Sequence, residues 1–266
     1  MDEVIHLPNS LIDSSVLARI EEAIGSYKIY GEMPLSEYHR VRQDVTEKGI
    51  PSLLPKRHYK QENLRDNAYY VGDKYLEECL NKSYPRTITC EHNHLYKIAG
   101  NTDFIDIQDS LYSKFGSGVR ISCSATFLYP DTEGFMGWHT NNTEGTNPLR
   151  IYVVYAKEGG ISFFRYINKK GHMVTDYDKQ GWNIRAFQPG NHTSSFWHCV
   201  YSGNTTRISY GYKVNNLKLD DLKDIGSIGS NIVVDQIDAD ISKGPEYINH
   251  VDIQASRKTS IPRKVG

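Results

Sequence analysis

The sequence predicts an α+β protein, in which N-terminal helices precede an antiparallel β-sandwich or barrel. Two patterns indicate this. Apolar residues recur at helical spacing in several stretches before residue 118, and from Val119 they form short runs separated by turn residues. The 19 tyrosines of this 266-residue chain also favour a strand-rich fold, because aromatic residues are enriched in strands.

Three helices are expected in the N-terminal part, at residues 14–24, 62–82 and 103–116. In the first, Leu17, Ile20 and Ile24 share one face, and Ser14 is a candidate N-cap. Residues 31–60 are polar and contain three prolines, so we expect a covering loop there.

Six strands are expected in the central part, at residues 119–129, 149–156, 161–167, 182–187, 195–201 and 207–214. After Val214 the chain is polar, with one further strand expected around residues 231–241. Polar terminal extensions are usually frayed unless something binds them. We therefore expect an assembly partner or another copy of the chain as the binding partner of this extension. The predicted parts are therefore a helical and loop region (1–118), a β core (119–214) and a polar extension (215–266).

Composition narrows the classes of function. The net charge is −1 and the isoelectric point is near 6.8, which argues against a nucleic-acid surface. The N-terminus lacks the features of a secretory signal, and no run approaches the ~20 apolar residues of a membrane span. Four cysteines lie without paired spacing, and Cys123 and Cys199 are expected to be buried thiols. We therefore expect a cytoplasmic protein.

The candidate site is formed by two histidines and an arginine from separate strands. Because side chains at i and i+2 share a face of a strand, His139 and Asn141 can both point into a barrel. Together with His198 they would supply two imidazoles and one oxygen, the ligands of a mononuclear non-haem iron(II) site. Arg207 and Ser209 share a face of the last strand, where a guanidinium and a hydroxyl can hold a carboxylate.

The residues before His139 resemble those of a known enzyme family. Tyr129-Pro130, followed by Gly134-Phe135, is similar to the segment before the first iron-binding histidine of iron(II)/2-oxoglutarate-dependent oxygenases, most of all in the prolyl hydroxylase branch. In that branch a tyrosine ten residues before the histidine contacts the co-substrate. Residues 135–141 are also similar to uncharacterised proteins of marine bacteriophages, a setting that would admit an auxiliary enzyme or a virion component.

The likeness extends along the next strands and ends at His198. Residues 148–155 resemble the arginine-led strand of the prolyl hydroxylase branch, which ends in a tyrosine facing the co-substrate, and residues 158–164 resemble its Gly-Gly turn. His198, then Arg207, then Ser209 match the family's closing pattern of histidine, arginine about ten residues on, and serine two later. The resemblance covers about residues 119–214.

The resemblance implies a double-stranded β-helix (jelly-roll) that binds iron(II) and 2-oxoglutarate. It implies that His139 and His198 hold iron and that 2-oxoglutarate chelates the same ion. Four residues are implied at the co-substrate, of which the first pairs with its remote carboxylate: Arg207, Ser209, Tyr129 and Tyr155. The protein would then oxidise a substrate and convert 2-oxoglutarate to succinate.

Asn141 departs from the family pattern, because the third ligand there is normally aspartate or glutamate. An amide oxygen is neutral and a weaker donor than a carboxylate. Asn141 itself ligates iron, or another acid such as Glu144 or Asp131 replaces it, or the site has lost its metal and the barrel only binds a partner. A vacant position that admits halide would need a smaller residue than asparagine.

Several functions and ligands therefore stay open. The favoured one is hydroxylation of a protein side chain, although a small-molecule or nucleobase substrate is an alternative. The others are a non-catalytic structural or interaction protein, which in a phage would be in the virion, and a jelly-roll module that binds a sugar or another small ligand. His192 is a rival for the second histidine ligand, and residues 90–94 form a Cys-Glu-His-Asn-His segment that we interpret as ordinary loop or strand.

Overall fold

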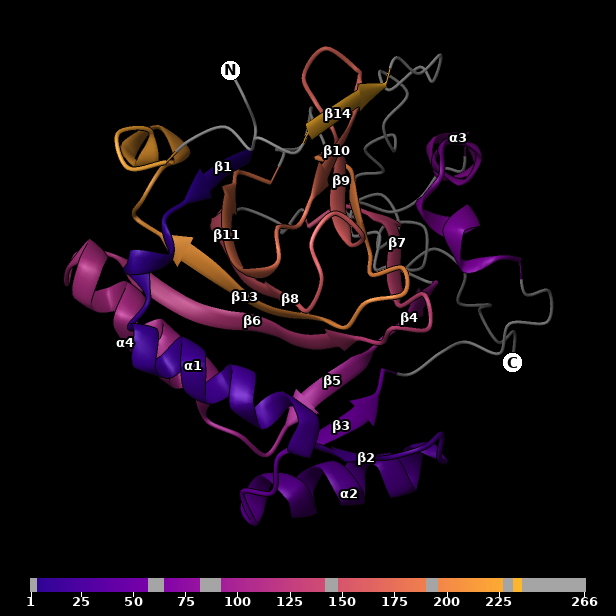
Figure 1. The fold of residues 1–266 in the computed structure, drawn as a ribbon, viewed down its shortest axis with the longest axis vertical. Helices are drawn as coiled ribbons and strands as arrows, with labels where there is room; N and C mark the ends of the chain where they lie inside the picture. Colours follow the sequence, from indigo (N-terminus) through magenta and orange to yellow (C-terminus); the bar gives the residue numbers. More distant parts are fainter. Residues whose placement is uncertain are drawn as a thin grey trace, which may run out of the picture.

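Two β-sheets face each other in this computed structural model, and helices cover their outer faces (Figure 1). The fold is mixed, with large sheets and few helices. The structure describes residues 4–56, 65–81, 92–141, 148–189, 196–226 and 232–235.

The larger sheet contains eight strands in the order β1-β11-β8-β13-β6-β5-β3-β2. Neighbouring strands are antiparallel, apart from the parallel pair β2 and β3. The first strand of the chain therefore lies at the edge beside β11. The strands are β1 (Val4–Leu7), β2 (Lys28–Ile29), β3 (Ser52–Pro55), β5 (Tyr96–Ala99), β6 (Arg120–Tyr129), β8 (Leu149–Ala156), β11 (Gly181–Phe187) and β13 (Arg207–Asn215).

The smaller sheet contains six antiparallel strands in the order β14-β10-β9-β12-β7-β4. Three of them, β4, β7 and β10, were not among the strands expected from apolar runs. The glycine of β7 and the Thr175-Asp176 pair of β10 interrupt those runs. The strands are β4 (Asn93–His94), β7 (Phe135–His139), β9 (Phe163–Ile167), β10 (Met173–Tyr177), β12 (His198–Tyr201) and β14 (Ile232–Asp235).

Helices α1 (Ser14–Ala23) and α4 (Asp103–Phe115) pack on the outer face of the larger sheet. Both were predicted, because their apolar positions follow the helical period. Ile20 of α1 and Ile107 of α4 are completely buried in this contact. The N-cap of α1 is Asp13 rather than the expected Ser14, and its carboxylate accepts a hydrogen bond from the N–H of Ser15.

The prediction of a covering loop at residues 31–60 is wrong where the structure describes that segment. Helix α2 (Leu35–Glu47) and strand β3 lie there. The prolines do not interrupt either element: Pro34 is the N-cap of α2, where proline removes no helical hydrogen bond, and Pro55 is the last residue of β3, beyond the residues that pair with β2. The apolar face of α2 is narrow, since Val45 is its one buried residue, and this weak pattern hid the helix.

The expected helix at 62–82 is shorter than predicted within the described residues. A 3₁₀ helix (Asn67–Val71) precedes α3 (Asp73–Asn81), and both pack on the outer face of the smaller sheet. Tyr70 and Tyr75 are buried there. Other 3₁₀ helices are Asn9–Leu11, Ile24–Ser26 and Leu219–Leu222. Across the described ranges, no helix combines the length and apolar character that crossing a bilayer requires.

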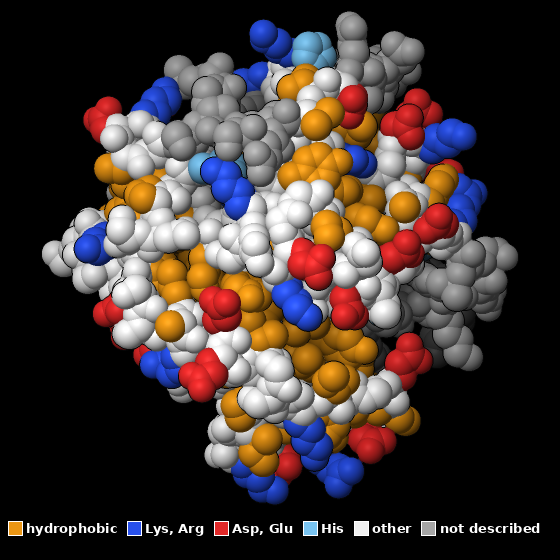
Figure 2. Space-filling model, viewed as in Figure 1, with side chains coloured by type: hydrophobic (Ala, Val, Ile, Leu, Met, Phe, Trp, Pro, Cys, Tyr) orange, Lys and Arg blue, Asp and Glu red, His pale blue; other side chains and the backbone are white. Residues whose placement is uncertain are grey.

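The last predicted strand, at residues 231–241, is present as β14 within its described part. The remainder of the polar extension lies outside the described residues, and the three-part division of the chain stays a prediction. Cys79 and Cys199 are buried free thiols and Cys123 is half-buried; Cys90 lies outside the described residues. Among the described residues on the face in Figure 2, basic and acidic side chains are interspersed.

The space between the two sheets contains both apolar and charged side chains. On β13, Ile208 and Tyr210 point outward into the core beneath the helices. Arg207 and Ser209 alternate with them, so they point inward. The inward face of the smaller sheet contributes aromatic side chains such as Phe164, which contacts Phe187 of the larger sheet. The candidate site lies in this interior.

Candidate active site

The two histidines lie side by side on neighbouring strands. His198 of β12 is directly opposite His139 of β7, and their ring centroids are 4.2 Å apart. The pairing register then shifts, because Val200 is opposite Met136, so β7 contains one residue more than β12 over this interval. Such a β-bulge re-aims side chains next to functional sites. Here it lets both Met136 and His139 face the interior.

Backbone carbonyls orient both imidazoles. Nδ1 of His139 is 2.8 Å from the carbonyl oxygen of Gly137, and Nδ1 of His198 is 3.0 Å from that of Phe196. A carbonyl only accepts, so each Nδ1 carries the proton and each Nε2 carries a lone pair. Burial lowers the pKa of His139 to about 4, and burial followed by the adjacent His139 lowers the pKa of His198 further below its usual value. Both rings are thus neutral near pH 7, as metal ligands must be.

The side-chain amide of Asn141 points toward Nε2 of His198. Its Nδ2 lies 3.0 Å from Nε2 of His198 and 3.1 Å from the hydroxyl of Tyr152. A half-turn of the planar amide would exchange Nδ2 and Oδ1. Two atoms bound about 2.1 Å from one metal ion at a right angle lie about 3.0 Å apart. The distance between the Asn141 amide and Nε2 of His198 is therefore compatible with two ligands of one metal ion.

Among the described residues no acid replaces Asn141. Asp131 lies exposed in the turn before Phe135, at the end of β7 remote from His139. The described ranges contain no group of three or more histidine, cysteine, aspartate or glutamate side chains able to hold a metal. The two remaining candidates, Glu144 and His192, fall outside the described residues.

Arg207 is buried, and only part of its guanidinium is engaged. Its Nε donates to Oδ2 of Asp178 at 2.9 Å, and its guanidinium carbon lies 5.1 Å from the ring centroid of Tyr129. Its side chain is 1% exposed, yet Nη1 and Nη2 have no hydrogen-bond partner among the residues that the structure describes. Ser209 lies two residues further along the same inward face and is also buried. The structure thus brings together Arg207, Tyr129 and Ser209 on β6 and β13.

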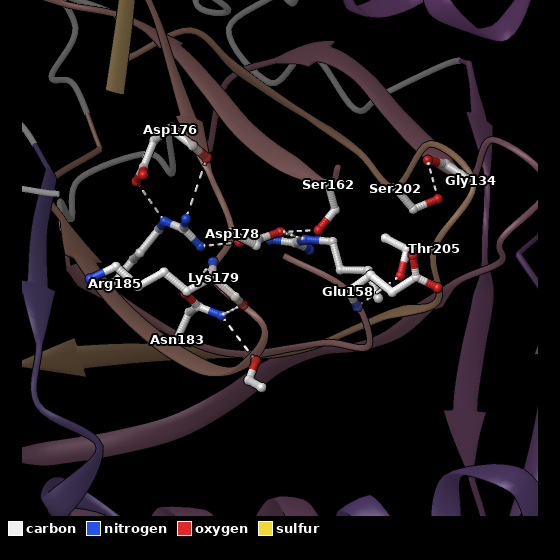
Figure 3. Close-up of polar contacts among 12 residues, drawn as sticks. Gly134, Glu158, Ser162, Asp176, Asp178, Lys179, Asn183, Arg185, Ser202 and Thr205 are labelled. Atoms are coloured by element: carbon white, nitrogen blue, oxygen red, sulfur yellow. Dashed lines mark hydrogen bonds and ion pairs between the residues drawn. The ribbon is translucent and has the colours of Figure 1, made fainter. Parts of the chain in front are cut away.

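Asp178 belongs to a buried charged cluster that sequence reasoning missed (Figure 3). Its Oδ1 accepts from Arg185 at 2.5 Å and its Oδ2 from Ser162 at 2.5 Å. Arg185 also donates to Oδ2 of Asp176 at 2.7 Å, and Nε2 of His6 lies 2.7 Å from the same oxygen. The detectable signal was a charged residue within a strand-like apolar run, as Arg185 is between Ile184 and Ala186.

The arginines keep the two aspartates of this cluster ionised. Burial by itself raises the pKa of Asp178, but Arg207 and Arg185 outweigh it and hold that pKa well below its usual value. The pKa of Asp176 is lowered in the same way, chiefly by Arg185 against burial. The cluster therefore consists of two cations and two anions near pH 7.

Tyr155, which the resemblance assigned to the co-substrate, is not at the site. It lies on the outer face of β8, where its hydroxyl donates to Glu21 at 3.1 Å. Tyr152 has the inward position instead, since its hydroxyl contacts Asn141. Burial raises the pKa of Tyr152, while Arg150, Asn141 and Arg207 oppose that shift. The alternation of side chains along a strand could have predicted this. Tyr152 is two positions from Arg150 and therefore shares its face, whereas Tyr155 is five positions away and lies on the other face.

Two further features have packing roles. Trp138 lies on the opposite face of the smaller sheet, where its indole N–H donates to the carbonyl of Gly72 at 2.8 Å. His92 stacks on the ring of Tyr70, with centroids 4.4 Å apart. Cys90 and residue 91 lie outside the described residues, so the Cys-Glu-His-Asn-His segment stays interpreted as ordinary loop or strand.

Comparisons with known proteins find similar structures but no similar sequence. No family model matches the chain, and no curated protein matches it. A crystal structure of a Pseudomonas putida prolyl-4-hydroxylase is similar over 66% of this chain and 97% of that one, with 12% identity and a TM-score of 0.32. A 2OG-Fe(II) oxygenase family oxidoreductase from Burkholderia pseudomallei is similar over 70% of this chain and 94% of that one, again with 12% identity and a TM-score of 0.32.

Proposed function

We propose that the protein is an iron(II)- and 2-oxoglutarate-dependent oxygenase built on a double-stranded β-helix. The observation that carries the proposal is the interior arrangement of two neutral, adjacent imidazoles and a buried arginine, two of whose nitrogen atoms have no partner within the described part of the chain. The order of His139, His198, Arg207 and Ser209 along the chain, which resembles the oxygenase pattern, supports it independently.

The strand order supports the jelly-roll part of the proposal. From β6 to β13, consecutive strands alternate between the larger and the smaller sheet, apart from β9 and β10, which are neighbours in the smaller one. The result is β11-β8-β13-β6 facing β10-β9-β12-β7. Two antiparallel sheets connected in this way are the pattern of a jelly-roll.

His139, His198 and Asn141 would hold the metal ion. When bound, iron(II) with 2-oxoglutarate and oxygen supplies the oxidising power that amino-acid side chains lack. The chain's own part is to keep each Nε2 unprotonated through the carbonyls at Nδ1 and to fix the rings by packing. Phe164 and Phe187 pack against His198, with centroids 5.4 Å away in each case, so this wall excludes water from one side of the site.

Arg207 would bind the remote carboxylate of 2-oxoglutarate. Buried arginine donors are usually satisfied, and two vacant nitrogen atoms on one planar fork match the two oxygen atoms of a carboxylate. Ser209 and Tyr129, which flank Arg207, would line the same subsite. We propose a protein side chain as the substrate, on the likeness of residues 119–214 to the prolyl hydroxylase branch.

An anaerobic titration tests the proposal. Metal-free protein receives iron(II) and then 2-oxoglutarate, and the visible charge-transfer band of the chelate is followed. We expect a band that His198→Ala abolishes by removing a metal ligand. Arg207→Ala should weaken 2-oxoglutarate binding by about 2–5 kcal/mol while leaving iron uptake unchanged. Absence of both metal uptake and the band in the unmodified protein would overturn the proposal.

A second candidate function is a non-catalytic barrel that binds a partner. The neutral Asn141 and the counter-ion that Arg207 already has in Asp178 favour it. It predicts that the unmodified protein takes up no iron(II) and that Asn141→Asp creates uptake. Iron(II) uptake by the unmodified protein excludes this alternative.

A further inference from the structure

The buried cluster around Asp178 is electrically complete without a ligand. Arg185 and Arg207 are each 1% exposed, and the carboxylates of Asp176 and Asp178 are 1% and 0% exposed. Figure 3 shows Arg185 between the two aspartates. The two cations and two anions of this cluster cancel, and the buried Arg150, which acts on Tyr152 together with Arg207, is a further cation outside it. A carboxylate arriving at Arg207 therefore places a second anion close to Asp178 in a site remote from water.

Asp178 and such a carboxylate would share one guanidinium. Asp178 accepts from Nε of Arg207, and the incoming group would accept from Nη1 and Nη2, which are vacant. The two anions would thus lie on adjacent edges of the same fork and repel each other. Asp178 cannot move away readily, because Arg185 and Ser162 hold both of its oxygen atoms.

We propose that Asp178 sets the affinity of the carboxylate site: it stabilises Arg207 when the site is empty and competes with the remote carboxylate of 2-oxoglutarate when the site is filled. This inference rests on the proposed function. It assigns Asp178 an effect opposite in sign to that of a residue that only supports the fold. Removing such a support weakens binding, whereas removing a competing charge strengthens it.

The two effects of removing the Asp178 charge differ in size, and the larger one strengthens 2-oxoglutarate binding. A unit charge removed at about 5 Å from a second one, at an effective dielectric constant near 20, changes an equilibrium on the order of a hundredfold. Losing the contact at Nε leaves the guanidinium of Arg207 free to reorient. We estimate that this loss of orientation weakens 2-oxoglutarate binding by about tenfold. The net expectation for Asp178→Asn, which keeps the shape and removes the charge, is about tenfold tighter binding of 2-oxoglutarate.

The test compares two ligands on anaerobic iron(II)-loaded protein at one fixed pH, because His6 contacts Asp176. The probes are 2-oxoglutarate and 2-oxobutyrate, which lacks the remote carboxylate. We expect Asp178→Asn to lower the Kd of 2-oxoglutarate about tenfold and to change the Kd of 2-oxobutyrate less than about twofold. Ser162→Ala removes a hydrogen bond to Asp178 without changing its charge, so it should not tighten binding.

Asp176→Asn is a second variant that tests the same inference if Asp178→Asn fails to fold. Asp176 contacts Arg185 rather than Arg207, so its removal should tighten 2-oxoglutarate binding in the same direction by a smaller factor. Unchanged or weaker 2-oxoglutarate binding in the folded aspartate variants would overturn the inference and leave the proposed function standing. An unmodified protein that binds neither 2-oxo acid would overturn the proposed function and this inference with it.

Discussion

Asn141 supplies a neutral amide at the point where His139 and His198 meet. Its amide is within 3.1 Å of both the His198 ring and the Tyr152 hydroxyl, so it is held in place before any metal binds. Preorganisation reduces the entropy lost on binding, whereas the missing charge weakens the attraction for a cation. These effects oppose each other, and the electrostatic one is the larger in a buried site.

Replacing Asn141 with aspartate should therefore strengthen metal binding. We expect Asn141→Asp to raise iron(II) affinity by about tenfold or more, because a carboxylate adds a full negative charge at a distance already suited to ligation. Competition with a coloured chelator measures the affinity. Asn141→Ala is the matched control and should lose affinity; equal affinities in all three proteins would mean that residue 141 is not a ligand.

The two tyrosines of β8 offer a paired test of which face lines the site. Tyr152→Phe removes the hydroxyl that contacts Asn141, so it should weaken iron(II) and 2-oxoglutarate binding by several-fold, on the order of one hydrogen bond. Tyr155→Phe removes a hydroxyl that contacts Glu21 on the outer face and should leave both affinities unchanged. The anaerobic titration reports both, and the reverse ranking would contradict the inward assignment of Tyr152.

The turn between β6 and β7 connects the larger sheet to the smaller one, and Tyr129 and His139 lie on the two strands that it joins. Gly134 closes this turn, with its N–H donating to the carbonyl of Pro130 at 3.0 Å and its carbonyl accepting from Ser202 at 2.7 Å. A Cβ at Gly134 would lie 2.5 Å from Cδ of Pro130 and 2.7 Å from its backbone nitrogen. The turn therefore depends on the absence of a side chain at this position.

A methyl group at position 134 should destabilise the turn between β6 and β7. We expect Gly134→Ala to lower the free energy of unfolding by about 1–3 kcal/mol, since proline and its backbone cannot move aside without distorting the turn. Gly25→Ala is the control, because a Cβ there meets nothing within 4 Å. Urea denaturation measures both variants, and equal stabilities would show that the turn accommodates a side chain.

The buried histidines and the buried aspartates should each contribute to the response of the whole protein to acid. His139 and His198 have folded-state pKa values below the unfolded value, so protons bind the unfolded chain first as the pH falls. Asp178 has a folded-state pKa below its unfolded value, so its contribution persists until the pH falls below about 4. The two groups thus act in different pH ranges.

The metal-free protein should lose stability between about pH 6.5 and pH 4, where the histidines differ between states. Each buried histidine contributes a slope of at most about 1.4 kcal/mol per pH unit. Urea denaturation across this range measures the slope, and His139→Gln should make it shallower. A slope that His139→Gln leaves unchanged would mean that other groups carry the acid response.

Local patterns in the chain were enough to predict β6, β8, β12 and β13 and the shared face of Arg207 and Ser209, but not β7, which carries His139. Periodicity and spacing are properties of neighbouring residues, so they are readable without a fold. Helix α2 was missed because its buried face is a single valine, and β10 because polar residues interrupt its apolar run.

The partners of the site residues depended on contacts between segments distant in the chain. Asp178 meets Arg207 across 29 residues and His6 meets Asp176 across 170, and no local pattern encodes such pairs. The bulge in β7 likewise arises from the register of two strands, and it sets which side chains face inward. The sequence thus indicated which side chains are candidates for the chemistry, whereas packing and register determined their neighbours, because buried charges acquire partners only when the sheets close over them.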